Sequence, residues 1–141
     1  MSVFVVDASV VIKWFVPEIH SDAARRLLEH DHQYFAPDLV FAETCNALWK
    51  KVRRGELTSA QGQHLVKDLG SIAVETIPAR ALANDAYSLA VSIGCSVYDA
   101  MYLALAVRLD SRMLTADERL ARMLSVMPLV ASHVLTIQDF H

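Results

Sequence analysis

Three of the 16 acidic residues in this chain, Asp7, Glu43 and Asp99, lie inside apolar sequence, where a carboxylate is unusual. A carboxylate with apolar neighbours is costly to bury unless a hydrogen-bond donor or a metal ion pairs with it. Asp117 belongs with them by position because, like Asp7, it follows a short apolar segment and precedes a helical pattern. These four acids are the candidate catalytic residues.

The acids in polar surroundings are expected to be solvated, and Glu43 could join them as a helical acid that faces water. Its apolar neighbours Phe41, Cys45 and Leu48 argue against that alternative. The acids predicted to lie on the solvated surface are Glu18, Asp22, Glu29, Asp31, Glu56, Asp68, Asp85, Asp110 and Asp139.

The other candidates also have structural explanations. Asp7 could cap the helix that follows it, and on sequence alone this explanation has about the same weight as a functional one. Thr115 with Glu118, and Ser96 with Asp99, both match the capping-box pattern of a helix start. A capping role and a role in a site are compatible, so neither alternative removes a candidate.

Strand-like and helix-like segments alternate along the chain. Such repeated units predict an α/β fold with a central parallel sheet and helices on both faces. Asp7 follows a predicted strand, and that edge of an α/β sheet is where ligands bind. The pattern predicts strands at about 3–6, 34–36, 73–77, 112–114 and 133–136, and helices at about 9–15, 21–30, 37–54 and 79–93, after a capping box at Thr58, around Asp99 and after Asp117.

Composition limits the class of protein. A chain of 141 residues with a hydrophobic fraction of 54% is the size of one well-packed domain. No apolar run reaches membrane-spanning length and the first strand leaves no room for a signal peptide, so a soluble cytoplasmic protein without membrane contact is expected. Cys45 and Cys95 have no metal-ligand spacing and are expected to be reduced core residues.

Basic residues offer a path for an anionic substrate. The net charge of −3 gives no global basic character, so any nucleic-acid binding must be local. Lys50 and Arg54 follow Glu43 by seven and eleven residues, which returns them to nearly the same helix face. They could track a phosphate backbone, or simply solvate and stabilise the end of the helix. Lys13, near the first acid, has the same two explanations.

Five motifs in order give the chain a resemblance to a known family. Together they are similar to PIN-domain proteins and, more narrowly, to the VapC-type toxins of prokaryotic toxin–antitoxin pairs. The likeness spans essentially the whole chain, so residues 1–141 are expected to form a single PIN domain with a PIN-like three-layer α/β/α architecture. The motifs are Val5-Val6-Asp7-Ala8-Ser9, Lys13-Trp14-Phe15-Val16-Pro17-Glu18, Ala36-Pro37-Asp38-Leu39 leading to Glu43, Tyr98-Asp99-Ala100, and Leu114-Thr115-Ala116-Asp117.

The resemblance implies a magnesium- or manganese-dependent endoribonuclease that hydrolyses RNA. It also implies a VapB-like antitoxin that blocks the site, and a homodimer. No core position of the family pattern is missing, which argues against an inactive copy. The family's four acidic positions match Asp7, Glu43, Asp99 and Asp117, and its two hydroxyl positions match Ser9 and Thr115.

The chemistry of these residues agrees with that implication. Oxygen ligands without His or Cys favour Mg²⁺ or Mn²⁺ over zinc. A bound ion can polarise a phosphodiester and lower the pKa of a water molecule that then attacks phosphorus. We expect Asp7 and Asp99 to be direct ligands, Asp117 to bind directly or through water, and Glu43 to complete the ligand set or act as general base. Ser9 and Thr115 would orient these carboxylates.

Two other classes of function are kept as alternatives. The first is a regulatory or binding protein on a PIN-like fold, whose acids would be structural; a metal titration separates it from a nuclease. The second is a metal-dependent phosphatase with an Asp nucleophile after the first strand. Phosphatases of that type need a second Asp at position 9, where this chain has Ser9.

Overall fold

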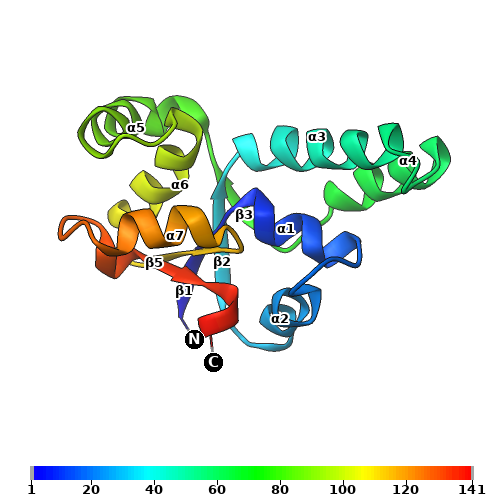
Figure 1. The fold of residues 1–141 in the computed structure, drawn as a ribbon, viewed down its shortest axis with the longest axis horizontal. Coiled ribbons are helices and arrows are strands. Elements are labelled where there is room, and N and C mark those ends of the chain that lie inside the picture. Colours follow the sequence, from blue (N-terminus) through cyan, green and yellow to red (C-terminus); the bar gives the residue numbers. More distant parts are fainter. Residues whose placement is uncertain (1, 141) are drawn as a thin grey trace.

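The computed structural model describes residues 2–140 and contains one parallel sheet of five strands. The strand order is β3-β2-β1-β4-β5, and every neighbouring pair is parallel. The parallel sheet predicted from the sequence is therefore confirmed (Figure 1). The strands are β1 (Val3–Val6), β2 (Gln33–Pro37), β3 (Glu75–Ile77), β4 (Arg112–Thr115) and β5 (Val134–Thr136).

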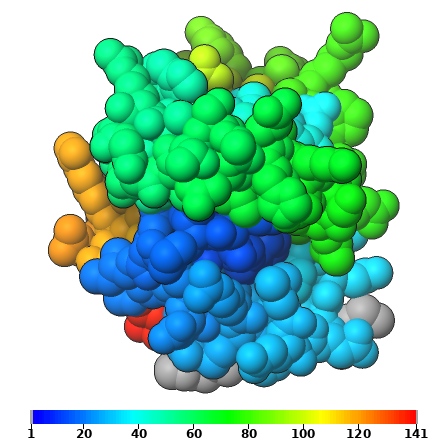
Figure 2. Space-filling view, turned by 90° about the vertical axis from the view of Figure 1, so that its right-hand side faces the viewer, coloured from blue at the N-terminus to red at the C-terminus, as the bar shows by residue number. Residues whose placement is uncertain are grey.

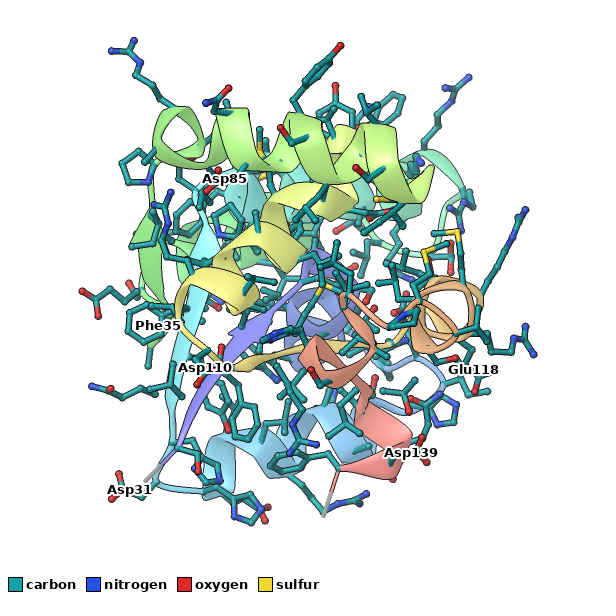
Figure 3. All side chains as sticks on the ribbon, turned by 90° about the vertical axis from the view of Figure 1, so that its left-hand side faces the viewer. Asp31, Phe35, Asp85, Asp110, Glu118 and Asp139 are labelled. Atoms are coloured by element: carbon teal, nitrogen blue, oxygen red, sulfur yellow. The ribbon has the colours of Figure 1, made fainter. Side chains whose placement is uncertain are left out.

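Helices cover both faces of this sheet and make the three-layer architecture that the sequence predicted. Right-handed crossovers put α1 to α4 on one face and α5 to α7 on the other, and Figure 1 shows these two groups on opposite sides. Figure 3 shows α5 lying over α6, with Asp85 on α5 and Asp31 at the other end of the molecule. The helices are α1 (Ala8–Phe15), α2 (Ser21–Arg26), α3 (Leu39–Arg53), α4 (Ser59–Leu69), α5 (Ala79–Ile93), α6 (Val97–Arg108) and α7 (Glu118–Ser125).

Three predicted boundaries differ from the structure by two or more residues. The helix predicted over 21–30 ends at Arg26, and a 3₁₀ turn, Leu27–Glu29, tightens its end. The long helix begins at Leu39 rather than 37, because Asp38 N–H still donates to the Ile77 carbonyl at 2.9 Å as an extension of the β2–β3 ladder. Strand β3 begins only at Glu75, where its pairing with β2 begins.

Other predicted ends are confirmed. Helix α5 runs from Ala79 to Ile93 and stops at Gly94, which has φ of 86°, a left-handed conformation that suits glycine. Thr58 and Gln61 form the predicted capping box at the start of α4.

The core lies between the sheet and its helices. The central strands β1 and β4 are buried from their second residue on, which explains the apolar sequence of β1 and the apolar Met113 and Leu114 of β4. A second, smaller cluster of Ile12, Val16 and Leu48 attaches the α3–α4 pair to α1. In the space-filling view α3 and α4 form a lobe above α1 and α2 (Figure 2).

Within residues 2–140 no individual helix is both long and apolar enough to span a bilayer. In this described part of the chain, one consecutive pair, α5 and α6, passes such a test on length and composition, and it bends by 111° at the break between the two helices.

Candidate active site

The candidate site lies where the chain leaves β1 and β4 in opposite directions. These two neighbouring strands feed α1 and α7, which cover opposite faces of the sheet. Asp7 N–H donates to the Leu114 carbonyl at 3.2 Å, so the two strands are still joined as they end. Ligands of open α/β sheets bind at such a switch point. The first and last candidate acids, Asp7 and Asp117, flank it.

Asp7 is a helix cap and a member of this site at the same time. Its side chain is only 7% exposed. Its Oδ1 accepts hydrogen bonds from the Ser9 amide at 2.8 Å and from the Ser9 hydroxyl. The Ser9 hydroxyl in turn accepts from Ala116 N–H at 3.0 Å and lies 3.3 Å from the hydroxyl of Thr115. Ser9 therefore ties the carboxylate of Asp7 to the end of β4.

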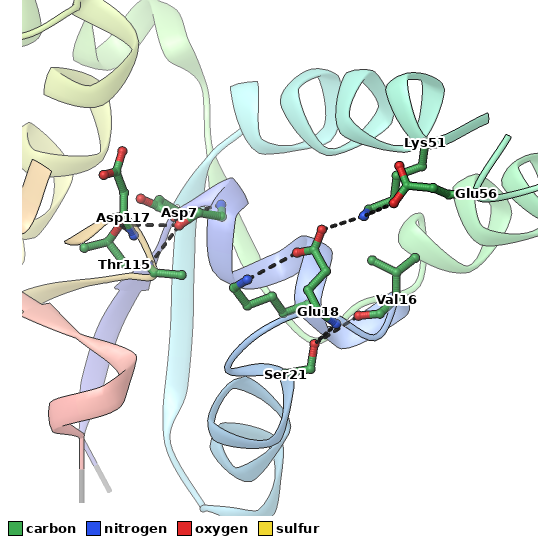
Figure 4. A network of polar contacts seen from close by, with 11 residues as sticks. Asp7, Val16, Glu18, Ser21, Lys51, Glu56, Thr115 and Asp117 are labelled. Atoms are coloured by element: carbon green, nitrogen blue, oxygen red, sulfur yellow. Dashed lines mark hydrogen bonds and ion pairs between the residues drawn. The ribbon is translucent and has the colours of Figure 1, made fainter. Parts of the chain in front are cut away.

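At the end of β4, the capping box expected from Thr115 and Glu118 is absent. Thr115 and Glu118 do not form a capping box, because Thr115 is a buried strand residue and Asp117 caps α7 by accepting from Leu120 N–H at 3.0 Å. The Thr115 hydroxyl accepts instead from Asp117 N–H at 3.1 Å. Figure 4 shows Asp7, Thr115 and Asp117 together. Thr115 thus orients the segment that carries Asp117.

Asp99 enters from the first turn of α6. The Ser96 hydroxyl accepts from Asp99 N–H at 3.1 Å, so the predicted cap at this helix start is present. The carboxylate is half-buried, and its charge raises the pKa of both Asp7 and Glu43. The charge of Asp117 in turn acts on Asp99. Asp99 is therefore the electrostatic centre of the four acids, which we call the acidic cluster: Asp7, Glu43, Asp99 and Asp117.

Glu43 reaches the acidic cluster from α3 and is held by a residue that the sequence analysis missed. The Tyr102 hydroxyl donates to Glu43 Oε1 at 2.6 Å. Tyr102 lies one helical turn after Asp99, so its spacing of three residues was the available signal. An apolar helix context made Tyr102 look like a core residue.

Burial raises the pKa of three of the four acids. Burial raises the pKa of Asp7 from 3.8 to about 6, against the hydrogen bonds from Ser9 and Thr115, while the nearby charge of Asp99 adds to the rise. Burial and the charge of Asp99 raise the pKa of Glu43, although the Tyr102 hydroxyl opposes this. Burial also raises the pKa of Asp99, and the Asp117 carboxylate adds to it. In residues 2–140 no Lys, Arg or His forms an ion pair with any of these acids.

These residues fit a hard divalent cation. The donors are all oxygen atoms, and a buried carboxylate without a basic partner is the kind of group that a cation stabilises. Among the described side chains, no three His, Cys, Asp or Glu are close enough together to hold one ion between them. Mg²⁺ retains several water molecules and needs only one or two direct carboxylates, so that arrangement still suits it.

A cavity of about 310 Å³ opens beside the acidic cluster. Ser9 and Glu43 lie on its wall together with Lys50 and Arg54, so the helix geometry inferred from the spacing of these residues is present. Arg54 is exposed and contacts Glu56 at 3.3 Å. The cavity therefore joins Glu43 to two basic side chains, Lys50 in α3 and Arg54 at its C-terminal end. Its remaining lining residues are Ala8, Ile12, Glu18, Asn46, Ala47 and Lys51.

Lys13 and Glu18 form an ion pair with each other, which the sequence analysis did not predict. Glu18 was predicted to be solvated, but Lys13 contacts its Oε1 at 3.2 Å and Lys51 its Oε2 at 2.6 Å (Figure 4). Burial opposes ionisation of Glu18, but its hydrogen bonds with Lys51 and Lys13 outweigh this and lower its pKa. Lys13 is itself buried. We call Lys13, Glu18 and Lys51 the ion-pair network; the position of Lys13 five residues before Glu18 was the only local signal for it.

Comparison with known proteins gives the same family as the motifs. The PIN domain family matches residues 4–124. Ribonuclease VapC3 of Pyrobaculum aerophilum is 35% identical over 119 residues, which cover 83% of this chain and 91% of that protein. Ribonuclease VapC9 of Mycobacterium tuberculosis is 30% identical over 117 residues, covering 83% and 87%.

Solved structures share the fold. PAE2754 from Pyrobaculum aerophilum superposes with a TM-score of 0.68 at 25% identity, covering 98% of this chain and 93% of that one. A chain of a toxin–antitoxin complex from Klebsiella pneumoniae gives a TM-score of 0.67 at 18% identity, covering 99% and 100%. The three-layer architecture is thus that of known proteins along nearly the full length of the chain.

Proposed function

Because the chain belongs to the PIN domain family, we propose that it is a metal-dependent endoribonuclease and the toxin of a toxin–antitoxin pair. Two relatives that are at least 30% identical carry the name ribonuclease, which supports cleavage of RNA. The proposal treats residues 1–141 as a single catalytic domain that works in the cytoplasm.

One observation carries the proposal: Asp7 is buried at the switch point with no basic partner in residues 2–140. Burial and the charge of Asp99 keep its pKa near 6, so its ionised form is costly at neutral pH. A buried acid with such a shifted pKa at a ligand-binding edge is a candidate for a functional group. A serine would cap the helix equally well without placing a charge there, so capping alone does not explain an aspartate at this position.

The residues of the site have distinct roles in this proposal. Asp7, Asp99 and Asp117 would hold Mg²⁺ or Mn²⁺, directly or through water. The bound ion supplies charge stabilisation for the phosphodiester and lowers the pKa of a water molecule. Glu43 accepts the proton of the attacking water as general base or completes the ligand set. Ser9 and Thr115 fix the orientation of the Asp7 and Asp117 segments by the hydrogen bonds described above.

The cavity next to Glu43 is the proposed path of the RNA strand. Lys50 and Arg54 line it and would neutralise phosphates on their way to the acids. Lys13 has a less direct role in this proposal: it holds Glu18, which also lines the cavity, and so shapes the path.

A VapB-like antitoxin and a second copy of the chain are the proposed protein partners. The support is the resemblance to VapC-type toxins and the names of the two relatives. An antitoxin helix in a groove, with a basic side chain among the acids, would supply the cation that the acidic cluster lacks. Light scattering of the purified chain, alone and with a co-expressed antitoxin, measures both associations.

Cleavage of RNA by purified protein tests the proposal. With Mg²⁺ or Mn²⁺ the protein should cut a mixed RNA substrate, and EDTA should stop the reaction. Asp7→Asn should lower the rate by at least about 100-fold, since the neutral amide replaces a ligand carboxylate of nearly equal shape. The matched control is Asp31→Asn, an exposed acid before β2 at the opposite edge of the sheet, which should cleave like the wild type.

Two outcomes would contradict the proposal. The first is undiminished cleavage by Asp7→Asn, and the second is cleavage that proceeds fully in EDTA. Release of inorganic phosphate from monoesters without cleavage of RNA would favour the phosphatase alternative.

A further inference from the structure

Tyr102 is a buried polar side chain next to the acidic cluster, and the proposed function gives it no role so far. It lies on α6, is only 2% exposed, and is one of the largest fully buried side chains of the molecule. Tyrosine hydroxyls that are buried need a hydrogen-bond partner, and most find one in the backbone. Tyr102 instead donates to the carboxylate of Glu43 at 2.6 Å, a short bond to an acid of the active site.

This hydrogen bond joins two helices that otherwise pack against different parts of the fold. Helix α3, which carries Glu43, packs mainly against α1 and α4. Helix α6, which carries Asp99 and Tyr102, packs mainly against α5 and against strands β1, β2 and β4. Helix α6 therefore supplies one acid of the site, Asp99, and through Tyr102 it also holds Glu43 of helix α3.

Glu43 needs such an anchor more than the other acids do. Asp7 and Asp117 are held as helix caps by backbone amides, and Asp99 sits in a capped first turn. Glu43 lies in the interior of α3 and has a longer side chain with three rotatable bonds. Among residues 2–140, its hydrogen bond with Tyr102 is the only one its side chain makes.

We propose that Tyr102 is a positioning residue for Glu43, a role that rests on the proposed nuclease function. Its hydroxyl restrains Oε1 and thereby leaves Oε2 for the reaction at the cavity that Glu43 lines. Because Tyr102 is buried and absent from the cavity lining, it acts through Glu43 and does not bind RNA itself.

Tyr102→Phe tests this role, and the chain offers a matched control. Tyr34 is also buried, at 6% exposure, and its hydroxyl donates to the Leu27 carbonyl at 2.5 Å away from the acidic cluster. Tyr102→Phe and Tyr34→Phe each remove one buried hydrogen bond, so both should lower the melting temperature to a similar extent. Tyr102→Phe should lower kcat for RNA by about 10- to 100-fold with little change in KM, because a small misplacement of a reacting group costs that much. Tyr34→Phe should leave kcat within about twofold of the wild type.

A double-mutant cycle shows whether the effect passes through Glu43. In the Glu43→Ala background, Tyr102→Phe should change kcat by less than about twofold, since the group that it positions is gone. The inference is overturned if Tyr102→Phe leaves kcat within about twofold of the wild type, as Tyr34→Phe should, if only KM changes, or if the effects of Tyr102→Phe and Glu43→Ala on kcat are additive. A wild-type protein that does not cleave RNA would instead overturn the proposed function, and this inference with it.

Discussion

Glu43 of the acidic cluster and Glu18 of the ion-pair network line the same cavity, but the carboxylates of the two groups have opposite surroundings. Glu18 lies between two lysines whose contacts lower its pKa. Asp7, which is more deeply buried, has no basic partner in the described chain, and burial raises its pKa to about 6. Lysine side chains therefore lie close to the candidate active site, but within residues 2–140 none of them forms an ion pair with an acid of the acidic cluster.

This difference is the one that we expect between a structural carboxylate and a functional one. The network at Glu18 fastens the segment after α1 to α3 and contributes stability at neutral pH. The acidic cluster costs stability at neutral pH, because like charges and burial both disfavour the ionised forms. A fold retains such a costly arrangement when a ligand of opposite charge uses it.

The largest predicted effect is a dependence of stability on pH that comes from Asp7. Its folded pKa is about 6 and its ordinary value is 3.8. The folded state therefore binds the proton more tightly, and stability falls as pH rises from about 4 to about 6 and then stays low. The full difference is about 3 kcal/mol. Urea unfolding of metal-free protein at several pH values should show this gain on acidification, and Asp7→Asn should lose most of it.

The second prediction concerns Glu18 and has the opposite sign. The lysines lower its pKa below 4.5, so its contribution to stability is present above that pH and is lost as pH falls through the folded pKa. Glu18→Gln should destabilise the protein at pH 7 by about 2 kcal/mol, because it leaves the buried Lys13 without its ion-pair partner and Lys51 with only Glu56, at 3.8 Å. Glu29→Gln, at an exposed position, is the control and should change the unfolding free energy little. Equal stability of the two variants would remove the distinction between the two regions.

The smallest predicted effect is on RNA binding. Lys50→Ala with Arg54→Ala should weaken binding and reduce the slope of log K against log salt by about 1.4, the value for two phosphate contacts on a single strand. The measurement uses the Asp7→Asn background, in which cleavage should be too slow to interfere with binding. Arg25→Ala with Arg26→Ala removes two exposed charges of α2 and serves as control. A slope that changes equally in both variants would mean that Lys50 and Arg54 are merely solvated residues at the end of α3.

The sequence predicted those parts of the molecule whose signals are local. An apolar run that ends in a carboxylate located β1 and Asp7, and a spacing of two residues related Ser9 to Asp7 and Thr115 to Asp117. The parallel sheet followed from alternation of strand and helix patterns. The roles of these residues in catalysis remain predictions.

Contacts between distant segments were not predictable in the same way. Glu18 looked solvated because its partner Lys51 belongs to another helix. Tyr102 looked like a core residue because its partner Glu43 is 59 positions away. The capping box assigned to Thr115 and Glu118 was wrong because β4 extends through Thr115 and leaves the cap to Asp117. In each case tertiary pairing decided the role of a residue whose type alone allowed several.

The central claim is that the acidic cluster costs stability in order to bind a divalent cation, and the melting temperature of Asp7→Asn at pH 7 tests it most directly. Asparagine keeps the helix cap and the shape of the side chain while it removes the charge. Without metal, Asp7→Asn should melt higher than the wild type; Mn²⁺ should raise the melting temperature of the wild type in a concentration-dependent way and that of the variant much less. A variant that melts lower than the wild type and responds equally to Mn²⁺ would contradict the account, because Asp7 would then be a structural cap alone.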